Sequence, residues 1–390
     1  MKKTGMNMES IRSQNRSLVL DYINSKGPVA RTEIASASGL TAASVSQITT
    51  QLLAEGLLKE IGTTGGTGVG RRRVLLDIDP FKSLVLAINI EPEETTVTVC
   101  DLKGRVVGEG TEAALIKILP TDRKVPAEEF ALHLCEECNK LKKSMDEDLL
   151  DHLECVSIAT TGLVDHQKAI SVHAYGIWDR PVELGKIFRS RLGLPVLLEN
   201  NVDAFAIAEL MYGVGRTRDN LFIIKWGPGI GSTIVLDDRI YRGRHGKTAE
   251  IGHFIVDQNG KQCNCGRRGC LETRASYSAL NEIMPFTPGD FERSYEAADP
   301  EVRARIDSAI KLFARCIVNS GILIAPNRIV LVGKLFKDPG LRSKLIDTCS
   351  SFDSVYSSKR IFYTALAGRE SYVGPAAVFA QKKLRDGSVE

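Results

Sequence analysis

One short segment of the sequence carries side chains of the kinds that bind metal ions. The four candidate ligands are His253, Cys263, Cys265 and Cys270. Four such ligands complete the tetrahedral coordination of a structural Zn²⁺, and two glycines inside the cysteine segment suit the tight turn that brings thiols together. Intracellular cysteines that only pack in a core are more often scattered along the chain. The spacing therefore predicts a bound zinc ion.

Two carboxylates flank the predicted metal site. Glu250 lies three residues before His253, and Glu272 lies two residues after Cys270. Because the zinc ion already has four ligands, we expect both carboxylates to face another molecule. The metal would then brace a polar pocket.

A second polar group stands between a predicted strand, 194–198, and a predicted helix, 203–212. This joint contains Asn200 and Asn201. Polar groups at the C-terminal end of such a strand point into the cleft where α/β proteins bind ligands. A helix cap is the simpler alternative, but two adjacent amides exceed what a cap requires.

The segment 250–253, followed by the cysteine spacing, resembles the signature of the ROK family, which comprises repressors, open reading frames and sugar kinases. The match is complete in ligand identity and spacing. The resemblance implies a structural zinc and a sugar pocket lined by Asn200, Asn201, Glu250, His253 and Glu272. His253 would give one ring nitrogen to zinc and the other to a sugar hydroxyl, so that the metal fixes the pocket geometry.

The sequence departs from ROK kinases at the residues that would transfer a phosphate. Asn201 occupies the position of the general base, and an amide cannot accept the hydroxyl proton. Asp203, two residues later, could not replace that carboxylate without moving the sugar. The segment 89–94 carries three acids where the family's first phosphate loop has glycines, and 331–334 matches the second nucleotide segment only in outline. We therefore expect no catalytic residues and no enzyme activity; the alternative is a sugar kinase that also binds DNA.

The composition is that of a globular chain long enough for two or three domains. It has 390 residues, of which 43% are hydrophobic and 25% charged, and no apolar run of membrane-spanning length. We expect neither a signal peptide nor a membrane helix, and nine cysteines without a disulfide pattern indicate a reducing, bacterial cytoplasm. The net charge of +3 comes from the segment 1–80, where ten Lys and Arg stand against seven Asp and Glu. We therefore expect this segment to contact a polyanion.

The segment 1–80 has the pattern of a winged helix-turn-helix domain. Helices are predicted over 11–24, over 32–38 and after Thr41, a good N-cap. In the third helix Val45, Ile48 and Leu52 share one face, and small polar residues suited to a DNA major groove fill the other. Two predicted strands, 57–61 and 74–78, flank a glycine-rich loop. The predicted DNA contacts are Ala43, Ser44, Ser46, Gln47, Thr50, Arg71 and Arg72.

Two other interpretations of the glycine-rich loop 62–70 are weaker. A phosphate-binding P-loop fails because Arg71 and Arg72 stand where Lys-Ser/Thr is required. A solvated basic hairpin is a simpler alternative, but the preceding pair of helices favours a wing. The arrangement is similar to the winged-helix repressors of the ROK family.

The rest of the chain, 81–390, reads as a duplicated α/β fold. A predicted hairpin over 84–100 recurs over 221–236, which suggests two related lobes around a cleft. The resemblance implies an actin-like, sugar-kinase (ribonuclease H-like) architecture with lobes at about 81–200 and 201–390. Cys135 and Cys138 share one face of a predicted helix, 131–143, and are interpreted as packing residues. The remaining histidines are interpreted as solvated or core residues.

These observations predict a transcriptional repressor of carbohydrate-utilisation genes. Its winged helix would bind a double-stranded DNA operator, and its kinase-like domain would bind a sugar or sugar phosphate that alters DNA affinity. A twofold operator implies at least a homodimer.

Overall fold

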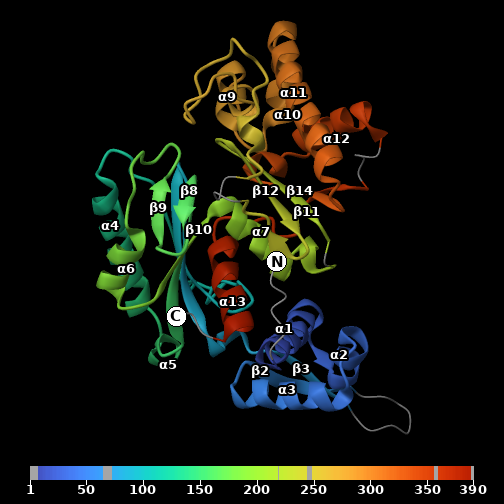
Figure 1. Cartoon of the computed structure of the whole chain (residues 1–390). Helices are drawn as coiled ribbons and strands as arrows, with labels where there is room; N and C mark the ends of the chain where they lie inside the picture. Colours follow the sequence, from blue (N-terminus) through green and yellow to red (C-terminus); the bar gives the residue numbers. More distant parts are fainter. Residues whose placement is uncertain (1–7, 65–72, 218, 244–247, 355–358, 388–390) are drawn as a thin grey trace.

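The computed structural model describes residues 8–64, 73–217, 219–243, 248–354 and 359–387. Figure 1 shows a small N-terminal unit below a body of two lobes. None of the helices in these ranges is long and apolar enough to cross a membrane.

The N-terminal unit packs three helices on a small antiparallel sheet of order β1-β3-β2. Its elements are α1 (Met8–Lys26), β1 (Val29–Ala30), α2 (Arg31–Ser38), α3 (Ala42–Ala54), β2 (Leu58–Thr64) and β3 (Arg73–Ile78). Thr41 caps α3, since its hydroxyl accepts a hydrogen bond from the Ser44 backbone N–H at 3.2 Å. Val45 and Leu52 are fully buried, so the predicted apolar face of this helix is confirmed.

The two lobes contain sheets of the same topology. The first has the order β10-β7-β4-β5-β6 and the second β13-β12-β11-β14-β15. In each sheet three strands form an antiparallel meander, and two further strands extend it in parallel. The repeated order is the duplication that the two hairpins predicted.

The strands of the first sheet are β4 (Leu84–Ile90), β5 (Glu94–Cys100), β6 (Ile116–Pro120), β7 (Leu153–Thr160) and β10 (Val196–Asn200). Those of the second are β11 (Leu221–Trp226), β12 (Ile230–Leu236), β13 (Arg239–Ile240), β14 (Arg328–Val332) and β15 (Ile361–Tyr363). A separate hairpin in the first lobe joins β8 (Leu163–Asp165) and β9 (Ile170–His173).

Helices cover the sheets in layers. The principal ones are α4 (Ala127–Lys143), α6 (Leu184–Leu192), α7 (Asn201–Tyr212), α11 (Pro300–Ile324), α12 (Pro339–Phe352) and α13 (Val373–Asp386). Shorter ones are α5 (Glu147–Leu150), α8 (Glu272–Ala275), α9 (Tyr277–Ile283), α10 (Phe291–Ala297), η1 (Pro80–Lys82), η2 (Val214–Thr217), η3 (Ile251–His253) and η4 (Lys334–Lys337). The buried thiols of Cys135 and Cys138 on α4 belong to the core of the first lobe, as packing residues should.

The helices α7 and α13 lie between the two sheets. Their apolar residues form one cluster with residues of β4, β11 and β14, and the same cluster continues into the core of the N-terminal unit through α1. Although α13 ends the chain, it packs on β4, β7 and β10 of the first lobe. The spatial lobes therefore do not follow the expected division at residue 200, because the chain returns to the first sheet at its end.

Candidate functional site

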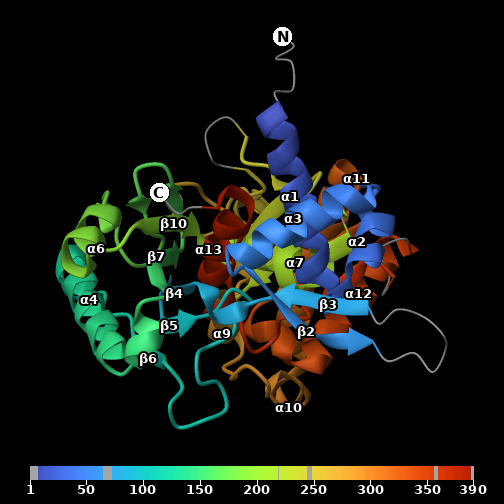
Figure 2. The same cartoon turned by 90° about the horizontal axis from the view of Figure 1, so that it is seen from below.

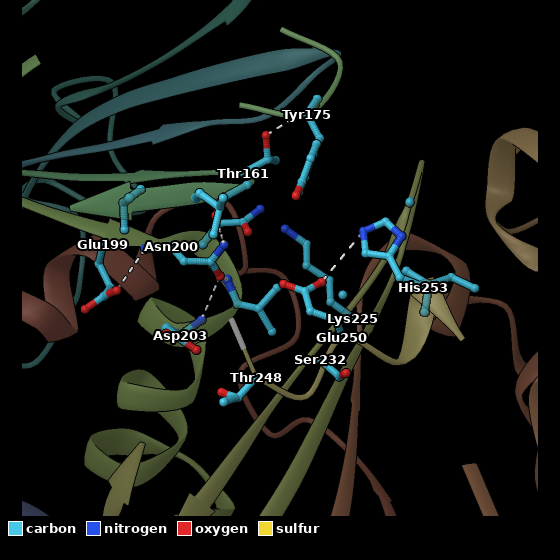
Figure 3. A pocket seen from close by; sticks show the side chains of 18 of the residues that line it. Thr161, Tyr175, Glu199, Asn200, Asp203, Lys225, Ser232, Thr248, Glu250 and His253 are labelled. Carbon is cyan, nitrogen blue, oxygen red and sulfur yellow. Dashed lines mark hydrogen bonds and ion pairs between the residues drawn. The ribbon is translucent and has the colours of Figure 1, made fainter. Parts of the chain in front are cut away.

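A cavity of about 520 Å³ opens between the two lobes. Its walls come from the turn after β4, the joint of β10 and α7, the β11–β12 loop and the segment around η3 (Figure 3). All five residues expected to bind a sugar line it, and they are Asn200, Asn201, Glu250, His253 and Glu272. The fold thus brings the β10–α7 joint and the metal segment, which are well separated in the sequence, to the same cavity.

Asn200 is held by the protein on both sides of its amide. Its carbonyl oxygen accepts hydrogen bonds from the backbone N–H groups of Val202 (2.8 Å) and Asp203 (3.2 Å), which makes it the N-cap of α7. Its amide nitrogen donates to the Gly162 carbonyl at 2.8 Å. This side chain therefore performs the capping role considered as the simpler alternative, and it also ties α7 to the segment before β8.

Asn201 faces the turn that replaces the phosphate loop. Its amide nitrogen donates to Glu91 Oε1 at 3.0 Å, and Lys225 of β11 forms an ion pair with the same carboxylate. Burial alone would raise the pKa of Glu91, but the charge and hydrogen bond of Lys225 hold this pKa below its ordinary value. A carboxylate is thus kept ionised on the turn that the sequence analysis aligned with the family's first phosphate loop.

A second ion pair joins the lobes beside the first. Lys334, the first residue of η4, lies with its Nζ 3.1 Å from Oε1 of Glu94, the first residue of β5. Glu91 and Glu94 thus each form an ion pair with a lysine of the second lobe. Two of the three acids that the sequence analysis expected to repel ATP phosphates are therefore paired with lysines across the interlobe gap, and the repulsion itself stays a prediction.

Arg242 connects the second lobe to the start of α7. Its guanidinium contacts Glu199 Oε2 at 2.6 Å and Asp203 Oδ2 at 3.0 Å. Burial and the neighbouring Glu199 carboxylate raise the pKa of Asp203 to about 6. Asp203 lies on the first turn of α7, as expected, and is turned to Arg242.

The four expected zinc ligands converge at one end of the cavity. Their ligand atoms all lie within 4.8 Å of one another, with Cys263 Sγ 3.7 Å from His253 Nδ1 and Cys265 Sγ 3.6 Å from Cys270 Sγ. Zn–S bonds of about 2.3 Å in a tetrahedron require ligand separations close to these values. The three thiols and the imidazole therefore fit a structural zinc ion.

His253 has its second nitrogen on the pocket side. Nδ1 faces the cysteines, while Nε2 lies 3.8 Å from Glu250 Oε2. The expectation that both flanking carboxylates stand clear of the metal ligands needs correction for Glu272. Its Oε1 lies 3.1 Å from Cys263 Sγ, because α8 begins two residues after Cys270 and folds this side chain back over the cluster.

Several lining residues escaped the sequence analysis. The ring of Tyr175 meets His253 edge-on at 5.8 Å, and His166, interpreted as a solvated or core residue, also lines the cavity. No spacing connects either residue to the metal segment. Lys225 did leave a signal, since it is the single charged residue in the otherwise apolar β11.

The expected DNA-contact residues occupy the outer face of α3. Ala43, Ser46, Gln47 and Thr50 are exposed, whereas Ser44 is half-buried beside the Thr41 cap. Seen from below, α3 lies in front of the lobes, with the strands β2 and β3 to one side of it (Figure 2). Arg71 and Arg72 lie outside the described residues.

Sequence comparison identifies the family of this chain and two related proteins. The profile of the ROK family matches residues 102–381. A putative xylose repressor from Caldicellulosiruptor sp. is 30% identical over 274 residues, which cover 70% of this chain and 66% of that protein. The DNA-binding transcriptional dual regulator NagC of Escherichia coli K12 is 28% identical over 278 residues, covering 71% of this chain and 66% of that protein. The chain thus spans about two thirds of the length of both relatives.

Solved structures share the fold. A ROK family transcriptional regulator, described as a homologue of the E. coli MLC protein, superposes with a TM-score of 0.77 at 24% identity, over 97% of this chain and 98% of that one. A ROK family glucokinase from Streptomyces griseus, solved with glucose and AMPPNP, gives a TM-score of 0.60 at 23% identity, over 77% of this chain and 100% of that one. The likeness to the regulator extends over the N-terminal unit as well as the lobes.

Proposed function

The chain belongs to the ROK family, and from that membership we propose that it is a sugar-responsive transcriptional repressor and not an enzyme. The related sequences named above are regulators. In this proposal the N-terminal unit is a winged helix-turn-helix domain over 1–80, and 81–390 is the sugar-binding domain. The protein acts in the cytoplasm on an operator that controls carbohydrate-utilisation genes.

DNA binding is assigned to α3. Its exposed face carries small and hydrogen-bonding side chains, and Gln47 at its centre has the donor and acceptor pair that recognises adenine in the major groove. Arg71 and Arg72, in the loop between β2 and β3, would contact phosphates or the minor groove. A twofold operator is read by two copies, so the acting species is at least a homodimer.

Zinc is assigned to the cluster of His253 and the three cysteines. When bound, it supplies a rigid brace and no chemistry on the sugar. Its imidazole ligand then presents Nε2 to the cavity beside Glu250, where both groups would hydrogen-bond sugar hydroxyls. Asn201 and Glu272 complete the sugar contacts from opposite walls.

The observation that carries the proposal is the position of α7. This helix of 12 residues, about 18 Å long, begins in the cavity at the Asn200 cap and ends beside the N-terminal unit. There the Asn24 side chain of α1 donates a hydrogen bond to the Met211 carbonyl at 2.9 Å. One rigid element therefore touches both the sugar cavity and the unit that carries α3, and a sugar that shifts α7 alters DNA affinity.

Selection of binding sequences from a random duplex library by the full chain tests this function. A sequence should emerge whose affinity changes at least about tenfold when its sugar is added, as a coupling between two sites requires. Gln47→Ala should weaken that sequence more than random DNA, whereas Gln14→Ala, an exposed glutamine on α1, should weaken neither. Sugar-dependent ATP turnover at ordinary kinase rates, without selection of any DNA sequence, would favour the kinase alternative.

A further inference from the structure

We propose that the sugar recognised by this cavity is uncharged, and that phosphorylated sugars and sugar acids are excluded by the protein's own carboxylates. The inference rests on the proposed function and specifies the chemical class of its effector. It comes from the charges that line the cavity and from what already occupies each group able to bind an anion.

The described lining of the cavity is strongly acidic. Its six carboxylic acids are Glu91, Asp165, Glu199, Asp203, Glu250 and Glu272, whereas its Lys and Arg residues are Lys225 and Arg242. Acids thus exceed these bases by four. A phosphate ester would bring further negative charge into a space where like charges lie close together.

Both cations of this lining are engaged by carboxylates of the chain. Lys225 is paired with Glu91, which also accepts the amide hydrogen bond of Asn201. The Arg242 guanidinium uses one nitrogen on both Glu199 and Asp203 and a second nitrogen on Glu199. A phosphate would have to break one of these pairs and leave the displaced carboxylate uncompensated in a largely buried site.

The backbone groups that often bind anions are occupied in the same way. The N-terminal N–H groups of α7, at Val202 and Asp203, are capped by Asn200, and the Asp203 carboxylate already lies in the first turn. In the glycine-rich loop between β11 and β12, the Ile230 N–H points to Glu272 Oε2 at 3.5 Å. The N–H groups of Val202, Asp203 and Ile230 therefore already face acceptors of the chain.

A neutral sugar suits the same lining. Its hydroxyl groups are hydrogen-bond donors, and ionised carboxylates are strong acceptors with no donor of their own. Glu250, His253 and Tyr175 lie together in the lining, and the ring of Tyr175 can stack on a sugar face. Glu250 can accept from hydroxyls, whereas His253, whose Nδ1 would bind the metal, donates from Nε2 to a hydroxyl oxygen. The described part of the lining is thus complementary to a neutral ligand rich in hydroxyl groups and repels anions.

Calorimetric titration of the full chain with matched pairs of ligands tests the proposal. The probes are D-glucose, D-xylose and N-acetyl-D-glucosamine, each compared with the ester that carries phosphate on its terminal hydroxyl. For the pair that binds, the free sugar should bind at least about tenfold more tightly than its phosphate, because like-charge placement is costly. A phosphate that binds as tightly as the free sugar, or more tightly, would overturn the inference and leave the sugar-responsive repressor intact.

A charge-neutralising variant examines the cause. Glu91→Gln keeps the shape of the side chain but leaves Lys225 without its carboxylate, so the preference for the free sugar should fall about tenfold. The matched control is Glu94→Gln, three residues later at the start of β5, whose lysine partner Lys334 does not belong to the described lining. This control should keep the wild-type preference.

Glu199→Gln provides a second, independent variant in case Glu91→Gln fails to fold. It weakens the hold on Arg242 and should move the preference in the same direction. An unchanged preference in whichever folded variants are obtained would overturn the inference. If no member of any pair binds and none alters DNA affinity, the proposed function fails together with it.

Discussion

The two walls of the interlobe cavity differ in the side chains that they carry. On the second lobe, Glu250, His253 and Glu272 retain the groups and the metal-ligand cluster expected of a sugar site. On the first lobe, Glu91 of the β4–β5 turn and Glu94 at the start of β5 pair with lysines across the gap, and Asn201 occupies the position where the resemblance expects a general base. In the proposed function, groups that bind a sugar are therefore separable from groups that transfer phosphate, and a cavity without the second set would serve as a sensor.

The prediction with the largest expected effect concerns loss of the metal ion that would brace the second-lobe wall. Cys270→Ala should release the metal and lower the free energy of unfolding by several kcal/mol, since metal binding at such a site contributes directly to folding. Elemental analysis and denaturant unfolding measure both effects. Cys316→Ala, a buried thiol outside the cluster, should keep the metal and cost about 1 kcal/mol. Purified wild type without zinc would remove the metal assignment.

The second test asks whether a single substitution in the first-lobe wall can restore kinase activity. Asn201→Asp returns a carboxylate to the base position but places it against Glu91, to which the amide now donates at 3.0 Å. We expect no sugar-dependent ATP turnover, because the phosphate cradle remains occupied, and a loss of about 1–3 kcal/mol from the broken hydrogen bond and the like charges. A coupled ATPase assay and thermal unfolding measure these outcomes. Turnover at kinase rates would show that the first wall is less altered than its contacts indicate.

The retained wall was also the part that could be predicted from the sequence. Metal ligands and their flanking acids lie close together in the chain, and strand and helix periodicity located the duplicated hairpins. Only part of the first-lobe wall could be predicted from the sequence. The acids of 89–94 were visible, but their partners Lys225 and Lys334 come from β11 and from the turn after β14, both in the other lobe, and no local pattern joins them. Arg242 and Tyr175 escaped for the same reason.

A third test asks whether the cavity communicates through α7. Asn24→Ala removes the hydrogen bond to the Met211 carbonyl without touching the cavity or α3. Sugar affinity should remain unchanged, while the effect of sugar on DNA affinity should shrink about fivefold, equivalent to about 1 kcal/mol of coupling. Titrations of DNA with and without sugar measure it, and Gln14→Ala on the same helix is the control. Full coupling in Asn24→Ala would place the communication elsewhere, for example in the α1–α13 contact.

The smallest test concerns the titration of Asp203 at the junction of the two walls. Its pKa in the folded protein, about 6, lies above the ordinary 3.8, chiefly through burial and the nearby Glu199. Between about pH 4 and 6 the folded protein therefore binds more protons than the unfolded chain, so this group's contribution to stability falls as pH rises. The Asp203→Asn variant has no ionisable carboxyl group at this position. Its stability relative to wild type should increase across the same interval by on the order of 1 kcal/mol and level off above it.

Denaturant unfolding of both proteins at several pH values measures this slope. The slope is independent of any constant loss from the missing contact to Arg242, since that loss shifts all points equally. Glu199 still holds the guanidinium in the variant, so the joint between β10 and α7 should keep its geometry. A difference that stays flat from pH 4 to 6 would mean that Asp203 is ionised throughout. Arg242 would then compensate the charge of Asp203 fully, in addition to that of Glu199.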